Sequence, residues 1–379
     1  MSKDAVNVFK LVKTPIYSHC FNHDNSVLAI TTENNVLIFN VSQPSKPQLI
    51  ATLADHDKTV TAVDISVHGR IVTCSQDRNA IVWEPLSDGS YKPTLVLLRI
   101  NRAATSAKWA PNGFKFACGS SARIVAVCYY EHENDWWVSK HIKSEIKSSI
   151  TSLDWHDNGV VLACGGTEGI VNVYSGFIKG LDKKEQVMNS PWGEGKYPFG
   201  LLLKQFYQGS WIHGIKFNAS LEKLAFVSHD ARLTIADAQN NIATVSNPSG
   251  LPLNDIVWVS DSKLVGAGFD CHPVEFSYDP NAGAVKFSKN IDKIVQSGVA
   301  KNISLDNFDN EDDDQENGQQ TFGISALRKF KDMDLKGKVS VVDNELGTTH
   351  QNTITQLRVL NNSTVSSSGL DGKVVIFKV

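Results

Sequence analysis

Apolar and polar residues alternate along much of the chain in short segments that recur at nearly regular intervals. Seven segments share a polar turn followed by an alternating apolar run. They are TTENNVLIF (31–39), SQDRNAIVW (75–83), SSARIVAVC (120–128), GTEGIVNVY (166–174), SHDARLTIA (228–236), GFDCHPVEF (268–276) and GLDGKVVIF (369–377). A period of two is typical of a β-strand, whose side chains point in turn to opposite faces. Each segment therefore predicts a turn and a strand.

A second apolar pattern precedes every turn. It reads IYSHCF, VTAVDI, ATSAKW, ITSLDW, IHGIKF, LNDIVW and ITQLRV, and its sixth residue lies 12 or 13 residues before the turn residue in each copy. The turn residues are Glu33, Asp77, Ala122, Glu168, Asp230, Asp270 and Asp371. Strands and turns recurring at about 44 residues are typical of the four-stranded blades of a β-propeller. The sequence predicts an all-β fold, a seven-bladed WD-repeat β-propeller.

The spacing between turns locates two insertions. The first three intervals are 44, 45 and 46 residues, whereas Glu168 to Asp230 spans 62 and Asp270 to Asp371 spans 101. The last interval has room for an eighth blade or a long insertion. Its middle, DNFDNEDDDQENGQQ (306–320), is acidic and rich in amides, a composition typical of disorder. We expect one propeller over 1–379, with an insertion at 286–349 that holds a strand end, the disordered tract and a short helix at about 322–335.

The two ends of the chain predict how the ring closes. The last repeat stops at Val379, two residues after its third strand, so its blade lacks an outer strand. AVNVFKLV (5–12) alternates but belongs to no repeat. We expect it to complete the last blade and to remove an exposed edge that would favour aggregation.

The composition of the chain argues against several classes of function. With 37 Lys and Arg against 40 Asp and Glu, the net charge of −3 argues against binding nucleic acid by bulk charge. No apolar run approaches the ~20 residues that span a bilayer, and the N-terminus lacks the apolar region of a secretory signal. We expect a soluble cytoplasmic protein with reduced cysteines, because none forms a CxxC pair. The cysteines are Cys20, Cys74, Cys118, Cys128, Cys164 and Cys271.

The second repeat contains residue types that also occur in hydrolase sites. They are His56, Thr73, Ser75, Asp77 and Trp83. In a blade this spacing favours a structural chain, in which the aspartate accepts from the histidine, the histidine meets the hydroxyl of Thr73 or Ser75, and the hydroxyl meets the indole N–H. No G-x-S-x-G motif accompanies the set. The other repeats keep fragments such as His229-Asp230.

The remaining polar motifs also favour structural roles. Cys74, Cys118 and Cys164 occupy equivalent blade positions, which we expect to be spread around the ring rather than to converge on a metal. The glycine-rich GSSAR and GGTEG each join two strands, whereas a phosphate loop joins a strand to a helix. The residues predict no enzyme, no cofactor and no metal.

Two features suggest partner binding. Trp136 and Trp137 are adjacent in DWWVSKHIK (135–143), so at least one indole should face away from the inner side of its sheet. Packing between blades or contact with a partner would each account for it. The second feature is TFGISALRKFKDMDLKGK (321–338), where apolar residues recur at every third position and charged residues fill the other side. The apolar residues are Ile324, Leu327, Phe330 and Met333, and the charged ones are Arg328, Lys329, Lys331 and Asp332.

This pattern predicts a short amphipathic helix with Thr321 or Ser325 as its N-cap. Its apolar stripe could fold onto its own propeller or bind a groove on another protein, and its tethered position favours the partner.

Several segments together resemble one family. KPTLVLLRINRAATSAKWAPNGFKFACGSSARIVAVCYYEHENDWWVSKHIK (92–143) is similar to the most characteristic stretch of the WD-repeat subunit, subunit 1, of the actin-related protein 2/3 complex. RIVTCSQDRNAIVWEP (70–85), SLDWHDNGVVLACGG (152–166), PWGEGKYPFG (191–200) and WIHGIKF…VSHD (211–230) agree with that family in order and spacing. The chain departs from it in a longer acidic tract and in ending directly after the last strand.

The resemblance implies a non-catalytic scaffold in the seven-protein assembly that nucleates branched actin filaments. The partners that it implies are the other subunits, the actin filament and the acidic tails of nucleation-promoting factors. It implies no cofactor, and a place in the cytoplasm at cortical structures of the actin cytoskeleton.

The resemblance also implies site residues. The family carries a helix at the position of SALRKFKDMDLK that is similar to one reaching the mother filament. The candidate actin contacts are therefore Ile324, Leu327, Arg328, Phe330, Lys331 and Met333. The candidate subunit or activator contacts are Arg99, Arg102, Trp136 and Trp137.

The alternative is a WD-repeat adaptor or peptide reader in another multiprotein complex. A substrate receptor of a ubiquitin ligase usually has an F-box-like region or an arginine soon after a blade's Trp-Asp, whereas Trp83 is followed by Glu84 and Pro85. A histone or phosphopeptide reader would use the central face of the ring, which blade sequences alone do not distinguish.

Overall fold

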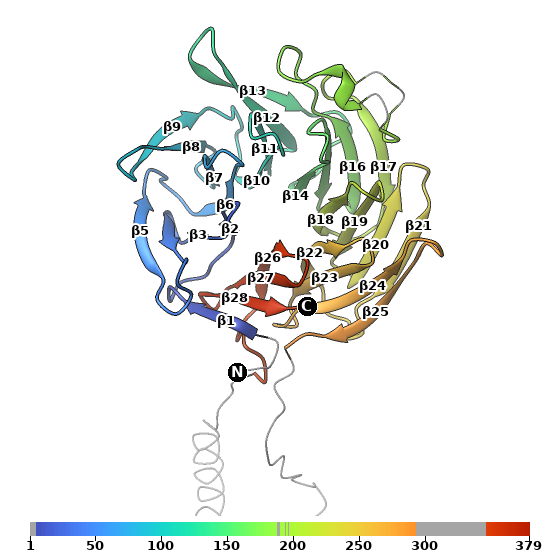
Figure 1. The fold of residues 1–379 in the computed structure, drawn as a ribbon. Helices are drawn as coiled ribbons and strands as arrows, with labels where there is room; N and C mark the ends of the chain where they lie inside the picture. Colours follow the sequence, from blue (N-terminus) through green and yellow to red (C-terminus); the bar gives the residue numbers. More distant parts are fainter. Residues whose placement is uncertain (1–4, 188–189, 194, 196, 293–345) are drawn as a thin grey trace, which may run out of the picture. The chain divides into compact units, whose positions relative to one another are not determined.

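The strands form seven four-stranded antiparallel sheets arranged in a ring (Figure 1). The computed structural model describes residues 5–187, 190–193, 195, 197–292 and 346–379. The sheets belong to one compact unit, Met1–Lys293 with Thr348–Val379. Each sheet is a blade whose first strand lies nearest the centre of the ring. The expected seven-bladed β-propeller is confirmed.

Successive strands along the chain build successive blades. Blade 1 contains β2 (His19–Phe21), β3 (Val27–Thr31), β4 (Val36–Asn40) and β5 (Gln48–Leu53), and blade 2 contains β6 (Val60–Ile65), β7 (Ile71–Ser75), β8 (Ala80–Pro85) and β9 (Tyr91–Val96). Blade 3 contains β10 (Ala104–Trp109), β11 (Lys115–Ser120), β12 (Ile124–Glu131) and β13 (Trp136–Ile142). Blade 4 contains β14 (Ile150–Trp155), β15 (Val161–Gly166), β16 (Ile170–Ser175) and β17 (Leu202–Tyr207). Blade 5 contains β18 (Ile212–Asn218), β19 (Lys223–Ser228), β20 (Arg232–Asp237) and β21 (Ile242–Ser246). Blade 6 contains β22 (Leu253–Ser260), β23 (Lys263–Gly268), β24 (Val274–Asp279) and β25 (Ala284–Asn290). Blade 7 contains β26 (Ile354–Asn361), β27 (Thr364–Gly369), β28 (Lys373–Lys378) and β1 (Ala5–Lys10).

The first strand of the chain completes the last blade. β1 pairs antiparallel with β28, with Val8 opposite Val375, and the two strands lie side by side at the base of the ring in Figure 1. Phe9 is only 2% exposed. The chain after β1 crosses the turn of blade 7 so closely that a Cβ on Gly372, which has φ +72°, would overlap the carbonyl of Val12. The expected closure is therefore confirmed.

The two long intervals differ in what the structure describes. The first insertion lies inside blade 4, between β16 and β17, and contains a 3-10 turn, Lys184–Val187. In the second long interval, β25 is the strand that we expected at the start of the insertion. The acidic tract at 306–320 and the helix at about 322–335 lie outside the described residues, so both remain predictions.

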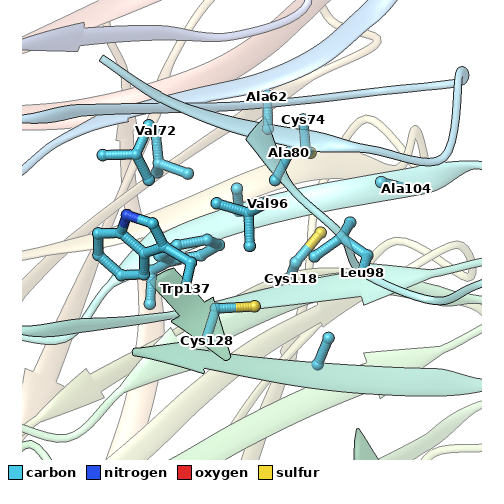
Figure 2. Close-up of a cluster of buried hydrophobic side chains, with 14 of the residues drawn as sticks. Ala62, Val72, Cys74, Ala80, Val96, Leu98, Ala104, Cys118, Cys128 and Trp137 are labelled. Atoms are coloured by element: carbon cyan, nitrogen blue, oxygen red, sulfur yellow. The ribbon is translucent and has the colours of Figure 1, made fainter. Parts of the chain in front are cut away.

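Apolar side chains between neighbouring blades form the core. One cluster, shown in Figure 2, fills the space between blades 2 and 3 and includes Cys74, Cys118 and Trp137. All six cysteines are free and buried, as expected for packing residues. The expectation that the equivalent cysteines are spread apart is wrong for Cys74 and Cys118, because facing sides of adjacent blades meet in one cluster. A hydrogen bond to Cys74, together with burial, raises the pKa of Cys118.

Polar side chains join the innermost strands to one another. Aspartate carboxylates accept hydrogen bonds from the backbone of the next blade, and threonine hydroxyls donate to its carbonyls. The aspartate bonds are Asp64 to Trp109, Asp154 to Phe217 and Asp255 to Leu357, each 2.9 Å. The threonine bonds include Thr61 to Ala104 at 3.0 Å and Thr105 to Ile150 at 2.7 Å. These bonds fix each blade against its neighbour, so the connecting loops are held on a firm frame.

Candidate functional site

The polar set of blade 2 forms one continuous hydrogen-bond chain. His56 Nδ1 lies 2.7 Å from Asp77 Oδ2, and His56 Nε2 lies 2.8 Å from Thr73 Oγ1. Trp83 donates its indole N–H to the same hydroxyl at 3.0 Å. Ser75 stays outside the chain, because its hydroxyl donates to the Lys58 carbonyl at 2.8 Å. Thr73 is therefore the hydroxyl that the histidine meets.

The same arrangement recurs in blade 7, where the sequence analysis did not identify it. His350 lies 3.0 Å from Asp371 through Nδ1 and 2.7 Å from Ser367 through Nε2. Burial opposes ionisation of Asp371, but the bond with His350 outweighs it and lowers the pKa of Asp371 to about 2. The signal was present in the sequence, since the histidine precedes the aspartate by 21 residues and the hydroxyl by 17 in both blades.

Blade 5 differs from what its sequence suggested. Asp230 occupies the turn, but it accepts from Ser228 and Arg232 rather than from His229. His229 instead meets His213 across 2.9 Å. Interpreting His229-Asp230 as a fragment of the blade 2 chain is therefore wrong for the histidine. His229 and Asp230 both lie in the turn after β19, whereas the histidine of the blade 2 and blade 7 chains precedes its aspartate by 21 residues.

These chains are buried in their sheets rather than open to a ligand. His56, Thr73 and Trp83 are all buried, and each polar atom of the chain already has a partner. Such a chain satisfies buried polar groups and stiffens the blade. Among the described residues, no group of three or more His, Cys, Asp or Glu side chains could hold a metal ion.

The adjacent tryptophans face opposite sides of β13. Trp137 is 8% exposed and packs on Trp109 and Phe116, with ring centroids 5.9 and 5.5 Å apart. Trp136 is 57% exposed at the tip of the β12–β13 hairpin. Trp137 also belongs to the apolar cluster between blades 2 and 3, so packing between blades accounts for Trp137 alone, whereas Trp136 presents its indole to solvent.

Three cations line a pocket at the end of the blades where the turn of blade 3 lies. The pocket has a volume of about 590 Å³ and brings Arg99 together with Arg123 and Lys143. Its apolar wall comes from Ile100, Ile124 and Ile146, and no carboxylate of a described residue lies in its lining. Arg102, which the sequence analysis paired with Arg99, is exposed but is not part of this lining.

Arg123 and Lys143 were missed because they lie on different connections from Arg99. Arg123 follows the expected turn residue Ala122, and Lys143 directly follows β13. In an antiparallel blade, the connection after the outer strand and the turn between the second and third strands lie at the same end. A search that compared these two loop types could have grouped the three residues.

The other candidate contacts cannot be placed. Ile324, Leu327, Arg328, Phe330, Lys331 and Met333 lie outside the described residues. Their assignment to an actin-binding helix therefore remains a prediction.

Comparison with known proteins identifies the family. Residues 47–84 and 138–175 match the family model of the WD domain, G-beta repeat. The chain is 58% identical to actin-related protein 2/3 complex subunit 1 of Saccharomyces cerevisiae, over 100% of this chain and 98% of that protein. The chain belongs to the actin-related protein 2/3 complex subunit 1 family. Other members include subunit 1A-B of Xenopus laevis and subunit 1 of Schizosaccharomyces pombe, each 38% identical over 98% of this chain and 96% or 98% of the relative.

The matched segments show how repeats of this subunit 1 family member relate to its blades. Residues 47–84 cover β5 to β8, and 138–175 cover most of β13 and then β14 to β16. Each sequence repeat thus begins with the outer strand of one blade and continues into the next. This offset leaves the last blade one strand short, which is why β1 completes it. In the part of the chain that the structure describes, no helix is long and apolar enough to cross a membrane.

Proposed function

We propose that this protein is a non-catalytic scaffold subunit of the actin-related protein 2/3 complex, which supports the nucleation and branching of actin filaments. Its relatives, matched over nearly their whole length, carry that complex in their names. A closed ring with bonded inner strands suits a platform, because loops at both ends of the blades keep fixed positions while several partners bind. The other subunits are its first partners, and the actin cytoskeleton is its place in the cell.

The observation that carries the proposal is the cationic pocket of Arg99, Arg123 and Lys143. Three positive side chains, with no carboxylate among the described residues of the lining, attract an anionic ligand. The isoleucine wall adds a surface for one apolar side chain. We assign this pocket to the acidic tails of nucleation-promoting factors, whose charge and extended form suit it.

Two further surfaces complete the proposal. Trp136 is a large indole exposed at a hairpin tip, a residue type enriched at the centres of protein interfaces, and we assign it to contact with another subunit. The helix expected at 322–335 is assigned to the side of the actin filament on its sequence alone.

The pocket is tested by reversing its charges in the reconstituted complex. Arg99→Glu with Arg123→Glu should weaken the binding of a fluorescent activator tail about tenfold, since each exposed charge pair contributes ~0.2–1 kcal/mol and reversal adds repulsion. Filament nucleation by that activator should fall in parallel. Lys286→Glu, an exposed lysine on β25, serves as the matched control. Unchanged tail affinity in the double variant would refute the assignment.

The helix is tested separately. Leu327→Ala with Phe330→Ala removes two apolar anchors, each worth roughly 1.5–3 kcal/mol when buried at an interface. Assembly of the complex and the melting temperature should stay unchanged, while binding to filament sides and branch number should fall. Loss of assembly with normal filament binding would place the helix among the structural elements instead.

A further inference from the structure

A cavity lies at the centre of the ring, between the inner strands of the blades (Figure 1). It has a volume of about 500 Å³, and the strands that line it are β2, β6, β10, β18, β22 and β26. Asn22 and Asn25 of the β2–β3 turn belong to its rim. In an antiparallel blade this turn lies at the end opposite the turn between second and third strands. The cavity is therefore separate from the pocket around Arg99.

Three cations from three different blades converge on this central cavity. Lys108 of β10, Lys216 of β18 and Arg358 of β26 line it, and each is the fifth residue of the pattern that precedes the turns. The same three residues also line a narrower cavity of about 140 Å³, together with residues nearer the start of the inner strands such as Thr61 and Thr105. The cations thus lie where the two cavities meet, and a ligand can reach them from the wider one.

The carboxylates beside these cations are withdrawn between the blades. Lys108 Nζ lies 3.1 Å from Asp64, and Lys216 Nζ lies 3.1 Å from Asp154. The two lysine side chains are 25% and 21% exposed, whereas the two aspartates are only 4% and 9% exposed and also accept backbone N–H bonds from the next blade. Arg358 Nη1 lies 3.1 Å from Asp64 as well, so three cations share two paired carboxylates. The side chains that face the cavity are therefore mainly positive.

The cations repel one another and keep donors for a ligand. Burial and the charge of Arg358 lower the pKa of Lys108, and Lys216 adds to this effect while Asp64 opposes it. An ammonium has three N–H donors, and among the described residues Lys108 and Lys216 each donate only to their aspartate. Burial also raises the pKa of Asp255 on β22, so this carboxyl offsets the cations less than an aspartate in water would. An anion between the three cations would relieve their repulsion.

We propose that the central cavity binds a small phosphorylated molecule, whose phosphate oxygens accept hydrogen bonds from Lys108, Lys216 and Arg358. Donors that approach from three blades suit a tetrahedral oxyanion better than a planar carboxylate. The half-buried rings of Phe217 and Trp258 line the same cavity and provide a surface for the apolar part of the ligand. The volume of the cavity is within the usual range of small-molecule sites.

Phenyl phosphate, which combines a phosphate with one aromatic ring, is the probe for this cavity. Isothermal titration calorimetry of the full-length chain measures its affinity, with inorganic phosphate and benzoate as comparisons. Phenyl phosphate should bind about tenfold more tightly than either, because inorganic phosphate lacks the ring and benzoate lacks the tetrahedral dianion. The absence of saturable binding of phenyl phosphate in the millimolar range would overturn the inference.

A matched pair of double variants tests the role of the cations. Lys216→Met with Asp154→Asn removes one cation together with its buried partner, while an amide oxygen can still accept from the Phe217 backbone. It should weaken the binding of phenyl phosphate about tenfold, as the loss of a charge-assisted hydrogen bond predicts. The control is Lys223→Met with Asp237→Asn, a pair outside the lining whose lysine is also 21% exposed, and it should leave the affinity within about twofold. Equal affinities in the two double variants would overturn the inference.

Further variants separate binding from folding and this cavity from other sites. Lys216→Arg keeps the charge and should retain most of the affinity, whereas a loss as large as in the double variant would show a purely structural role and overturn the inference. Lys216→Gln, which can still donate to Asp154, repeats the test should the double variant fail to fold. Arg99→Glu/Arg123→Glu should leave the affinity for phenyl phosphate within about twofold. A loss of binding there would overturn the inference and leave the proposed function standing. Tighter binding of a phosphoserine peptide than of phenyl phosphate through Lys216 would also overturn it.

Discussion

Lys115 and Asp182 form an ion pair whose two side chains are completely withdrawn from solvent. Lys115 begins β11 in blade 3, and Asp182 lies in the connection of blade 4, so the pair joins neighbouring blades. The ammonium also donates to the Gly176 carbonyl at 2.9 Å and lies 5.1 Å from the centroid of the Trp155 ring. Burial lowers the pKa of Lys115 and the nearby carboxylate opposes this effect. Each charge therefore depends on the other to remain in the interior.

Removing one member of this pair should destabilise the protein strongly. Lys115→Met leaves the carboxylate of Asp182 buried without a counter-charge, which costs about 3–5 kcal/mol in other buried pairs. Adding Asp182→Asn removes that charge while an amide oxygen can still accept from the Ile178 backbone, as the carboxylate does at 2.7 Å. The double variant should therefore be more stable than Lys115→Met. Urea unfolding of the three proteins measures this order, and a less stable double variant would contradict it.

Closure by β1 should stabilise the whole ring. Deleting residues 1–12 removes the outer strand of blade 7 and exposes the edge of β28. We expect a lower melting temperature and a tendency to associate, both measurable by calorimetry and light scattering. A truncated chain that melts like the parent and stays monomeric would show that closure contributes little.

Two substitutions in β1 separate the contribution of side-chain packing from that of backbone pairing with β28. Phe9→Ala empties a fully packed site and should cost about 3–5 kcal/mol. Val6→Ala, at a side chain that is 54% exposed, should change stability by no more than about 0.5 kcal/mol.

The adjacent tryptophans should have separable effects. Trp137→Ala removes an indole packed on Trp109 and Phe116 and should cost about 3–5 kcal/mol of stability. Trp136→Ala should leave the melting temperature unchanged and reduce the yield of assembled complex in a co-purification. Equal stability losses in both variants would place Trp136 among the core residues.

The fold could be predicted because its signals are local and repeated. Strand alternation and turn residues depend on neighbours in sequence, and seven copies in register identify the blades. The closing role of β1 followed from the missing strand at Val379. The split between Trp136 and Trp137 followed from strand geometry, although only packing against Trp109 could decide which indole is buried.

Contacts between blades could not be predicted in the same way. Lys115 and Asp182 are 67 residues apart, and Asp182 lies in the long connection between β16 and β17, outside the repeated strands. Cys74 and Cys118 occupy equivalent positions of two neighbouring blades, which the repeat pattern alone places apart on the ring. The side chains of adjacent blades pack against each other, however, and both cysteines lie in one cluster. The pocket around Arg99 depends on connections of different blades, whose meeting is a property of the tertiary fold.

Acidification should destabilise the protein partly through His213. Burial and the neighbouring His229 lower the pKa of His213 from 6.5 to about 4. Between these values the unfolded chain binds a proton that the folded chain excludes, so stability is full above pH 6.5 and falls toward pH 4. His213→Asn should show a shallower fall of melting temperature over this range. Identical slopes in variant and parent would contradict the assignment. His19, whose pKa burial also lowers, should account for part of the slope that remains.

The two histidine chains allow a direct comparison of what a buried hydroxyl contributes. In blade 2, Thr73 bonds both His56 and Trp83, whereas in blade 7 Ser367 bonds His350 at a position where Phe377 replaces the tryptophan. Thr73→Val would leave two buried polar groups without their partner, and Ser367→Ala would leave one. Each such group costs about 1–3 kcal/mol, so Thr73→Val should be the more destabilising change by about that amount. Combining Thr73→Val with Trp83→Phe removes the orphaned indole N–H and should recover part of the loss, as measured by urea unfolding. If the combined variant is no more stable than Thr73→Val alone, the indole bond contributes nothing measurable and the difference between the blades must come from packing.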